Sequence, residues 1–436
     1  MSEQILDQNA VVESSEDAVF DDIRPCRDDE AQQELAVIAN DESLVNGIVR
    51  LRYPKLSRFI GPLLKIPVRS YIKNAVRKIN SIEDFQMQVA AAVTRMIDNT
   101  TDGVTFRGFE KLNPDRGYLF ISNHRDISLD PCFIDFAYHS YYNQTVRIAI
   151  GDNLLKMPAA TALMRLNKSF IVKRSVTLPR ERLKEVNHLS HYIGLSLKEG
   201  HSIWIAQREG RAKDGNDCTE EAVLKMLHMY GRKQGKSFGE YMSSLNIVPV
   251  SITYEYDPGD VAKANELEER ARNDGKYQKS EFEDIRSIIK GINDYKGRVC
   301  IVAGDPVSGG FETPSQLAAL IDRFIYLNYE FYPSVMLAAH GLGLCGDDEI
   351  ASISTEDRNK FNNRLQGYPE HLHKRIMQMY AYPYINRKRA ADGELDFTLD
   401  NVKESVCEPS ASEPSASEPA ASEPAASESV DSAATE

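Results

Sequence analysis

The 436-residue sequence lacks the uninterrupted apolar run of about 18–20 residues that a membrane-spanning helix needs. Its six cysteines are scattered, and no two form a Cys-x-x-Cys pair. In a chain of this length, that spacing favours reduced thiols in a cytoplasmic compartment over a disulfide framework. The first residues, Met1-Ser2-Glu3-Gln4, lack the apolar segment of a signal peptide, so we expect none. Any membrane contact is therefore expected to be peripheral, on the inner face.

Patterns that bind metal ions are also scarce. His188 and His191 lie three residues apart, and His371 and His373 two apart, but no acid or cysteine completes a ligand set. We therefore expect no metal and no other cofactor. Nothing in the sequence suggests a nucleic-acid partner.

Negative charge is concentrated at the two ends of the chain. Residues 1–45 carry a net charge of −11 and residues 401–436 one of −7, so the total of −13 leaves the part between them at +5. A mildly basic folded part suits anionic substrates or an anionic lipid surface. We expect 1–45 to be an acidic disordered arm. The tail 401–436 repeats Glu-Pro-Ser/Ala-Ala-Ser from Glu408, has little to bury, and is also expected to be disordered.

Residues 46–101 are predicted to form a basic, helical N-terminal segment. Positions 50–78 hold nine Lys/Arg and no acid, with apolar residues between them. This run suits either an anionic lipid surface or a solvated helical face. A helix is predicted over 81–98, where Ser81 and Asp84 resemble a capping box. At the other end, 311–400 is predicted to be a C-terminal helical extension.

Residues 102–310 are predicted to form an α/β domain with a mixed, largely buried sheet of about seven strands flanked by helices. Short β-rich runs alternate with helical stretches such as 179–199 and 219–233. The expected strands are Val104–Arg107, Tyr118–Ser122, Val146–Ile150, Phe170–Lys173, Ile203–Ala206, Ile247–Tyr254 and Val299–Ala303.

The strongest chemical signal is a histidine directly after one of these strands, in Ile121-Ser122-Asn123-His124-Arg125-Asp126-Ile127-Ser128-Leu129-Asp130-Pro131. A strand end brings His124 to the rim of the sheet, where α/β proteins place their sites. Pro131 suits the first turn of a helix with Asp130 as its N-cap. A carboxylate on one ring nitrogen fixes the tautomer and leaves the other free to take a proton. Alone, the pattern also fits a surface histidine beside a capping aspartate.

Residues 118–308 resemble the glycerophosphate/lysophosphatidate acyltransferase family, which has four motif blocks in a fixed order. The first, in which four residues separate Asn-His from Asp, is similar to Asn123-His124 through Asp130. The other three are similar to Lys168-Ser169-Phe170-Ile171-Val172-Lys173-Arg174, to Ala206-Gln207-Arg208-Glu209-Gly210-Arg211, and to Ile247-Val248-Pro249-Val250.

The resemblance implies a role for each matching residue. His124 would take the proton of the acceptor hydroxyl, which attacks the thioester carbonyl, and Asp130 would orient His124. Arg174 and Arg211 would bind the acceptor phosphate, for which a guanidinium has suitable bidentate geometry. Arg174 also fits a solvated cation at the end of a strand, and Glu209-Gly210-Arg211 also fits an ordinary polar turn. The remaining two residues are Glu209, which would hold the acceptor or the arginines, and Gly210, which lets the backbone approach closely.

The resemblance also implies the substrates. The donor would be acyl-CoA or acyl-carrier protein, as substrate and not cofactor, and the acceptor a lysophosphatidate at a membrane surface. Two alternatives remain open at this stage: a glycerol-3-phosphate acceptor, because Arg125 follows the histidine, or a non-catalytic lipid-binding module.

Two departures from the family pattern affect the site. Five residues, not four, separate His124 from Asp130, so Asp126 competes with Asp130 as the histidine's partner. Arg211 comes one position early, and the proline before Glu209 is missing. We expect Asp130 to be the partner, because a helix start holds a carboxylate more rigidly than a loop.

Overall fold

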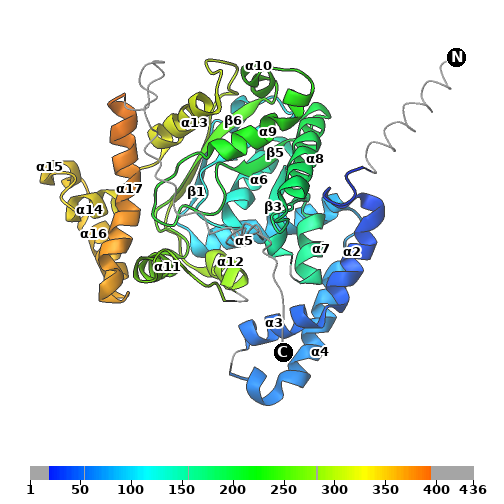
Figure 1. The fold of residues 1–436 in the computed structure, drawn as a ribbon. Helices are drawn as coiled ribbons and strands as arrows, with labels where there is room; N and C mark the ends of the chain where they lie inside the picture. Colours follow the sequence, from blue (N-terminus) through cyan, green and yellow to red (C-terminus); the bar gives the residue numbers. More distant parts are fainter. Residues whose placement is uncertain (1–18, 54, 156, 281–282, 394–436) are drawn as a thin grey trace, which may run out of the picture.

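A seven-stranded sheet forms the centre of the computed structural model, which describes residues 19–53, 55–155, 157–280 and 283–393 (Figure 1). The strand order is β1-β7-β6-β2-β5-β3-β4. This confirms the predicted α/β class, and each predicted strand matches an observed one to within one residue at either end. The strands are β1 (Val104–Arg107), β2 (Leu119–Ser122), β3 (Arg147–Gly151), β4 (Ser169–Val172), β5 (Ile203–Ala206), β6 (Ile247–Tyr254) and β7 (Val299–Ala303).

The sheet is mixed because one pairing reverses direction. β2 pairs in parallel with both β5 and β6, and β3 pairs in parallel with β4 and β5. β7 runs antiparallel to β6, and β1 runs parallel to β7. The carboxyl ends of β2, β3, β4, β5 and β6 therefore meet at one edge of the sheet, where α/β proteins place their sites.

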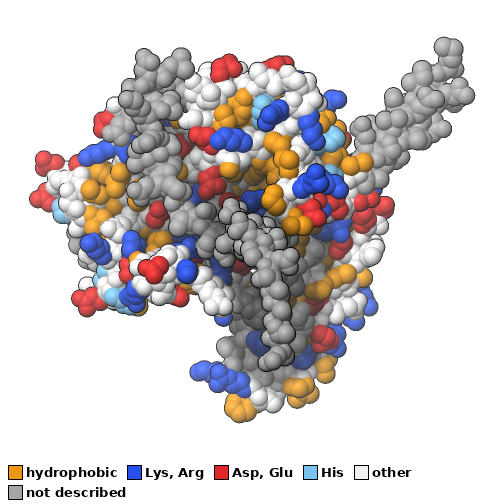
Figure 2. Space-filling view, in the orientation of Figure 1, with side chains coloured by type: hydrophobic (Ala, Val, Ile, Leu, Met, Phe, Trp, Pro, Cys, Tyr) orange, Lys and Arg blue, Asp and Glu red, His pale blue; other side chains and the backbone are white. Residues whose placement is uncertain are grey.

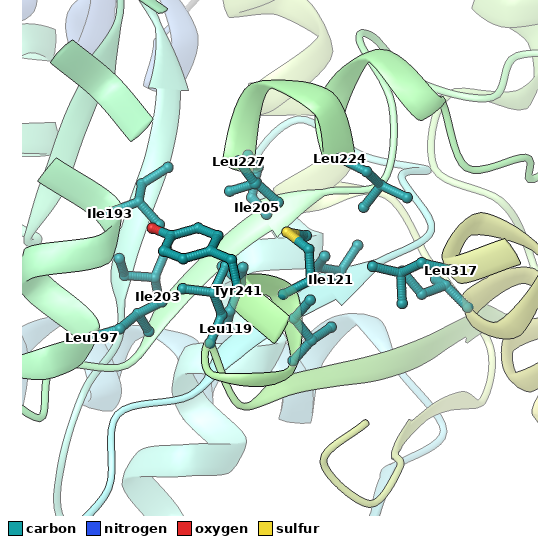
Figure 3. Packing of buried hydrophobic residues seen from close by; sticks show 14 of the residues in the cluster. Leu119, Ile121, Ile193, Leu197, Ile203, Ile205, Leu224, Leu227, Tyr241 and Leu317 are labelled. Carbon is teal, nitrogen blue, oxygen red and sulfur yellow. The ribbon is translucent and has the colours of Figure 1, made fainter. Parts of the chain in front are cut away.

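Helices cover both faces of the sheet. On one face, Leu119 and Ile121 of β2 pack against Leu224 and Leu227 in the core shown in Figure 3. On the other face, Phe120 of β2 packs in a second core. This alternation follows from the two-residue period of a strand. The first face is covered by α8 (Pro179–Lys198), α9 (Glu221–Lys233), α10 (Phe238–Ser243) and α13 (Pro314–Asn328), and the second by α5 (Ile82–Thr100) and α6 (Leu129–Tyr142).

The N-terminal region contains more structure than the sequence predicted. Residues 19–45 were expected to belong to a disordered arm, but they include a helix that buries Leu35 and Ile38 in a core shared with later helices. Acidic residues fill the first turn of this helix, where they favour its positive end. Ser81 Oγ accepts from the N–H of Asp84 as the capping pattern predicted. Among the described residues, the helices before α5 are α2 (Asp28–Asn40), α3 (Glu42–Arg52) and α4 (Ser57–Val76).

The C-terminal region packs as a helical group at the side of the sheet (Figure 1). The predicted tail 401–436, the first residues of the predicted arm and the end of the predicted extension lie outside the described residues. No helix in the described part of the chain is long and apolar enough to cross a membrane. The remaining helices are α7 (Pro158–Leu166), α11 (Asp260–Arg272), α12 (Glu283–Asn293), α14 (Pro333–Gly341), α15 (Asp347–Ile350), α16 (Thr355–Gln366) and α17 (His373–Ala391), with 3-10 turns at Phe109–Lys111, Asp152–Leu154 and Glu370–Leu372.

Candidate active site

The loop that carries His124 is fixed to the neighbouring strand. Asn123 follows β2, and its side-chain amide bonds the main chain of Ile252 in β6 in both directions, donating at 2.9 Å and accepting at 2.8 Å. On the other side, the N–H of Ala212 donates to the carbonyl of His124 at 2.8 Å. The histidine is therefore held between the ends of β5 and β6.

His124 and Asp130 are in direct contact. His124 Nδ1 lies 2.8 Å from Asp130 Oδ2. The carboxylate is fully buried, whereas the imidazole keeps 13% of its surface exposed. The ring also meets Trp204 of β5 edge-on, with 5.8 Å between ring centroids. A buried carboxylate on Nδ1 fixes the tautomer and leaves Nε2 as the nitrogen that takes a proton.

The helix after this loop begins two residues earlier than expected. α6 starts at Leu129, so Asp130 lies in its first turn and is not its N-cap. Asp126 Oδ1 instead accepts from the N–H groups of Ser128 and Leu129, both at 2.9 Å. Burial, together with the nearby charge of Asp130, raises the pKa of Asp126. The extra residue of the first block is therefore accommodated by a turn that Asp126 closes.

The third motif block lies at the end of β5, beside the histidine. Gly210 has a φ of +73°, a left-handed conformation that glycine adopts without strain. Glu209 is mostly exposed, and Arg211 is half-buried with its guanidinium donating to Ser287 Oγ of α12 at 2.8 Å. Arg211 directly precedes Ala212, whose N–H donates to the carbonyl of His124, so Arg211 lies beside the His124 loop.

Arg174 reaches this block from the edge of the sheet. It follows β4, which is three strand spacings from β2, or roughly 14 Å. Its guanidinium lies 3.7 Å from Glu209 Oε1, so the long side chain extends back toward the end of β5. The structure thus brings Arg174 to Glu209, and His124 to Asp130. The proposed roles of these residues stay predictions.

Residues from distant parts of the chain bind Arg125 and Asp130. Arg125 follows the histidine, but its side chain is buried and donates to Asp217 Oδ2 at 2.6 Å and to the carbonyl of Gly215 at 2.9 Å. Its guanidinium is therefore bound inside the protein. Tyr254 donates to the second oxygen of Asp130. Asp217 and Tyr254 lie 92 and 124 residues from their partners, and no local sequence pattern signals such pairs.

The described residues contain no group of three or more His, Cys, Asp or Glu arranged to hold a metal ion. What the site offers is a histidine held by a buried carboxylate, next to arginines at the rim of an α/β sheet. These residue types are the ones that general-base chemistry on an anionic substrate would need.

Comparisons with known proteins agree with the motif blocks. Residues 103–253 match the family model described as Acyltransferase, the kind of protein that the motif blocks resemble. Among solved structures, the chain is similar to the 1-acyl-sn-glycerophosphate (LPA) acyltransferase PlsC from Thermotoga maritima, with 15% identity and a TM-score of 0.33 over 69% of this chain and 95% of that one. A search of curated proteins found no match.

Proposed function

We propose that the protein transfers a fatty acyl chain from acyl-CoA or acyl-carrier protein to the free hydroxyl of 1-acylglycerol 3-phosphate. The observation that carries the proposal is the 2.8 Å contact between His124 Nδ1 and buried Asp130, at the sheet edge that also carries Arg174 and Arg211. This contact is what base catalysis requires, and it argues against a non-catalytic lipid-binding module.

The proposed reaction needs one proton to move twice. His124 Nε2 takes the proton of the acceptor hydroxyl as its oxygen attacks the thioester carbonyl. The carbon–sulfur bond then breaks, and the imidazolium returns the proton to the leaving thiolate. The products are the acyl ester and the free thiol. Asp130 stabilises the imidazolium between the two steps, and such a base contributes about 10²–10⁴-fold to the rate.

An acyl-transfer assay tests the function directly. Purified protein is incubated with palmitoyl-CoA or palmitoyl-carrier protein and with either 1-acylglycerol 3-phosphate or glycerol 3-phosphate, and the ester is measured. We expect turnover with the lysophosphatidate and none with His124→Ala, whose folding is checked by circular dichroism. Turnover with glycerol 3-phosphate alone, or a folded His124→Ala enzyme that keeps its activity, contradicts the proposal.

The two arginines are expected to act on acceptor binding. Arg211→Ala and Arg174→Ala should each raise the acceptor KM about tenfold, because a charge-assisted hydrogen bond to phosphate is lost in ground and transition states alike. Steady-state kinetics with each substrate varied in turn measure this effect. Arg272→Ala on α11, which is exposed, serves as the control. A rise in donor KM instead would assign the arginines to the thioester substrate.

We further propose that α3 and α4 bind the membrane that holds the acceptor. Large apolar side chains of α4 are exposed to solvent, with Phe59 86%, Leu63 64% and Ile66 65% accessible. Figure 2 shows hydrophobic and Lys/Arg side chains next to each other at the lower tip, over α3 and α4. Apolar residues beside cations suit the interface of an anionic bilayer.

Vesicle sedimentation tests this surface. Replacing Lys55, Arg58 and Lys65 by Gln should weaken binding to anionic vesicles about 100-fold at low salt, since each cation near the surface contributes about 1 kcal/mol. The control Lys225→Gln/Lys233→Gln removes exposed charge from α9, at a distance from this surface, and should bind normally. Equal binding by the triple variant and the native protein would show that the basic residues of 50–78 form a solvated helical face.

A further inference from the structure

A side chain from a distant strand binds Asp130. Tyr254 ends β6, and its hydroxyl donates to Asp130 Oδ1 at 2.7 Å. The other oxygen, Oδ2, contacts His124 Nδ1 and accepts from the N–H groups of Arg125 at 2.6 Å and Asp126 at 2.9 Å. The carboxylate is fully buried, so Tyr254 supplies the hydrogen bond that its second oxygen needs.

We propose that Tyr254 is a positioning residue for acyl transfer: its hydroxyl fixes the Asp130 carboxylate and disperses its charge, and so sets how strongly His124 holds a proton. This inference rests on the proposed role of His124 as the base. A hydrogen bond to a carboxylate draws electron density from it and weakens its attraction for a protonated imidazole. The imidazolium then returns its proton more readily to the leaving thiolate.

Other ionisable groups surround Tyr254, and its replacement leaves them in place. They are Asp126 in the His124 loop and Asp257 after β6. Tyr329 after α13 lies near the same Asp130, and Arg125 packs over its ring. Burial and the carboxylate of Asp130 raise the pKa of Tyr254 well above its ordinary value. The phenol therefore keeps its proton at neutral pH and acts as a donor.

The variant Tyr254→Phe tests the proposal because it removes only the hydroxyl. The ring keeps its contact with Phe133, at 6.0 Å between centroids. We expect kcat to fall about tenfold, since a buried oxygen loses its partner, with the acceptor KM changed less than about twofold. The acidic limb of the pH profile of kcat/KM should move up by about half a pH unit or more, because the stronger carboxylate favours the imidazolium.

The control is Tyr368→Phe, which removes another tyrosine–carboxylate bond outside the site. The Tyr368 hydroxyl lies 3.1 Å from Asp260 Oδ2. This variant should lower the melting temperature without moving the acidic limb. If Tyr254→Phe leaves the limb where the native enzyme has it, or if Tyr368→Phe moves it as far, the hydroxyl of Tyr254 is merely structural and the proposal is overturned.

An NMR titration of the His124 imidazole separates this inference from the proposed function. The imidazole resonance is assigned as the one that disappears in His124→Ala. This titration needs no turnover, so it measures the effect of Tyr254 even if the native protein transfers no acyl chain. The midpoint of the His124 titration should rise in Tyr254→Phe. In the native protein, the Cζ resonance of Tyr254 should follow the same titration, because the two residues share one carboxylate. Independent behaviour of the two resonances overturns the inference while leaving acyl transfer intact.

Discussion

Replacing Asp130 by Asn is expected to lower kcat by about 10²-fold or more, whereas Asp126→Asn should lower it less than about tenfold. In Asp130→Asn, the amide oxygen can still occupy the place of Oδ2, where it accepts from the main chain and from His124. What the amide lacks is the negative charge that stabilises the imidazolium in the transition state. In the other orientation, the amide N–H₂ faces His124 Nδ1 and imposes the wrong tautomer. Both arrangements impair the base.

Asp126→Asn is the matched control because it makes the same chemical change in the adjoining turn, on a carboxylate that does not contact His124. Its amide oxygen can still accept from Ser128 and Leu129, which keeps the turn closed. Since burial raises the pKa of Asp126, losing its charge should cost the fold little. Steady-state kinetics on both variants give the ranking. The reverse ranking would assign the histidine's partner to Asp126.

Replacing Arg125 by Ala is expected to lower the free energy of unfolding by about 3–5 kcal/mol, the usual cost of leaving a buried charge without its partner. Arg125 is 2% exposed and lies 2.6 Å from Asp217 and 3.5 Å from Asp257. Desolvation opposes its charge, but the two carboxylates outweigh it and raise the pKa of Arg125, so the guanidinium stays charged. Without it, both carboxylates are buried and lose this compensating charge.

Chemical denaturation of Arg125→Ala and Arg125→Lys measures this cost. Lysine keeps the charge but lacks the forked donor geometry of arginine. The free energy of unfolding of Arg125→Lys should therefore fall by less than that of Arg125→Ala. Lys225→Ala is the control, since it breaks an exposed pair with Glu221 and should change stability by less than about 1 kcal/mol. A change in Arg125→Ala as small as in the control would mean that water enters and solvates Asp217.

The fold class and the strands were predictable because their signals are local. The strand from Ile247 to Tyr254 is a continuous apolar and β-branched run, and every one of its residues is buried. The position of His124 after β2 follows in the same way from the strand that precedes it. The helices of residues 19–45 were not predictable from composition. Their acidic residues lie in first turns and on exposed faces, while a few apolar residues such as Leu35 find a core supplied by later helices.

The sequence by itself therefore determined the sheet and the edge of the sheet at which His124 lies. Tertiary structure decided that Arg125 points inward to Asp217 and that Tyr254 binds Asp130. The physical reason is separation along the chain. Tyr254 lies 124 residues after Asp130, and the two meet only because β6 pairs beside β2 and α6 packs on the same face of the sheet.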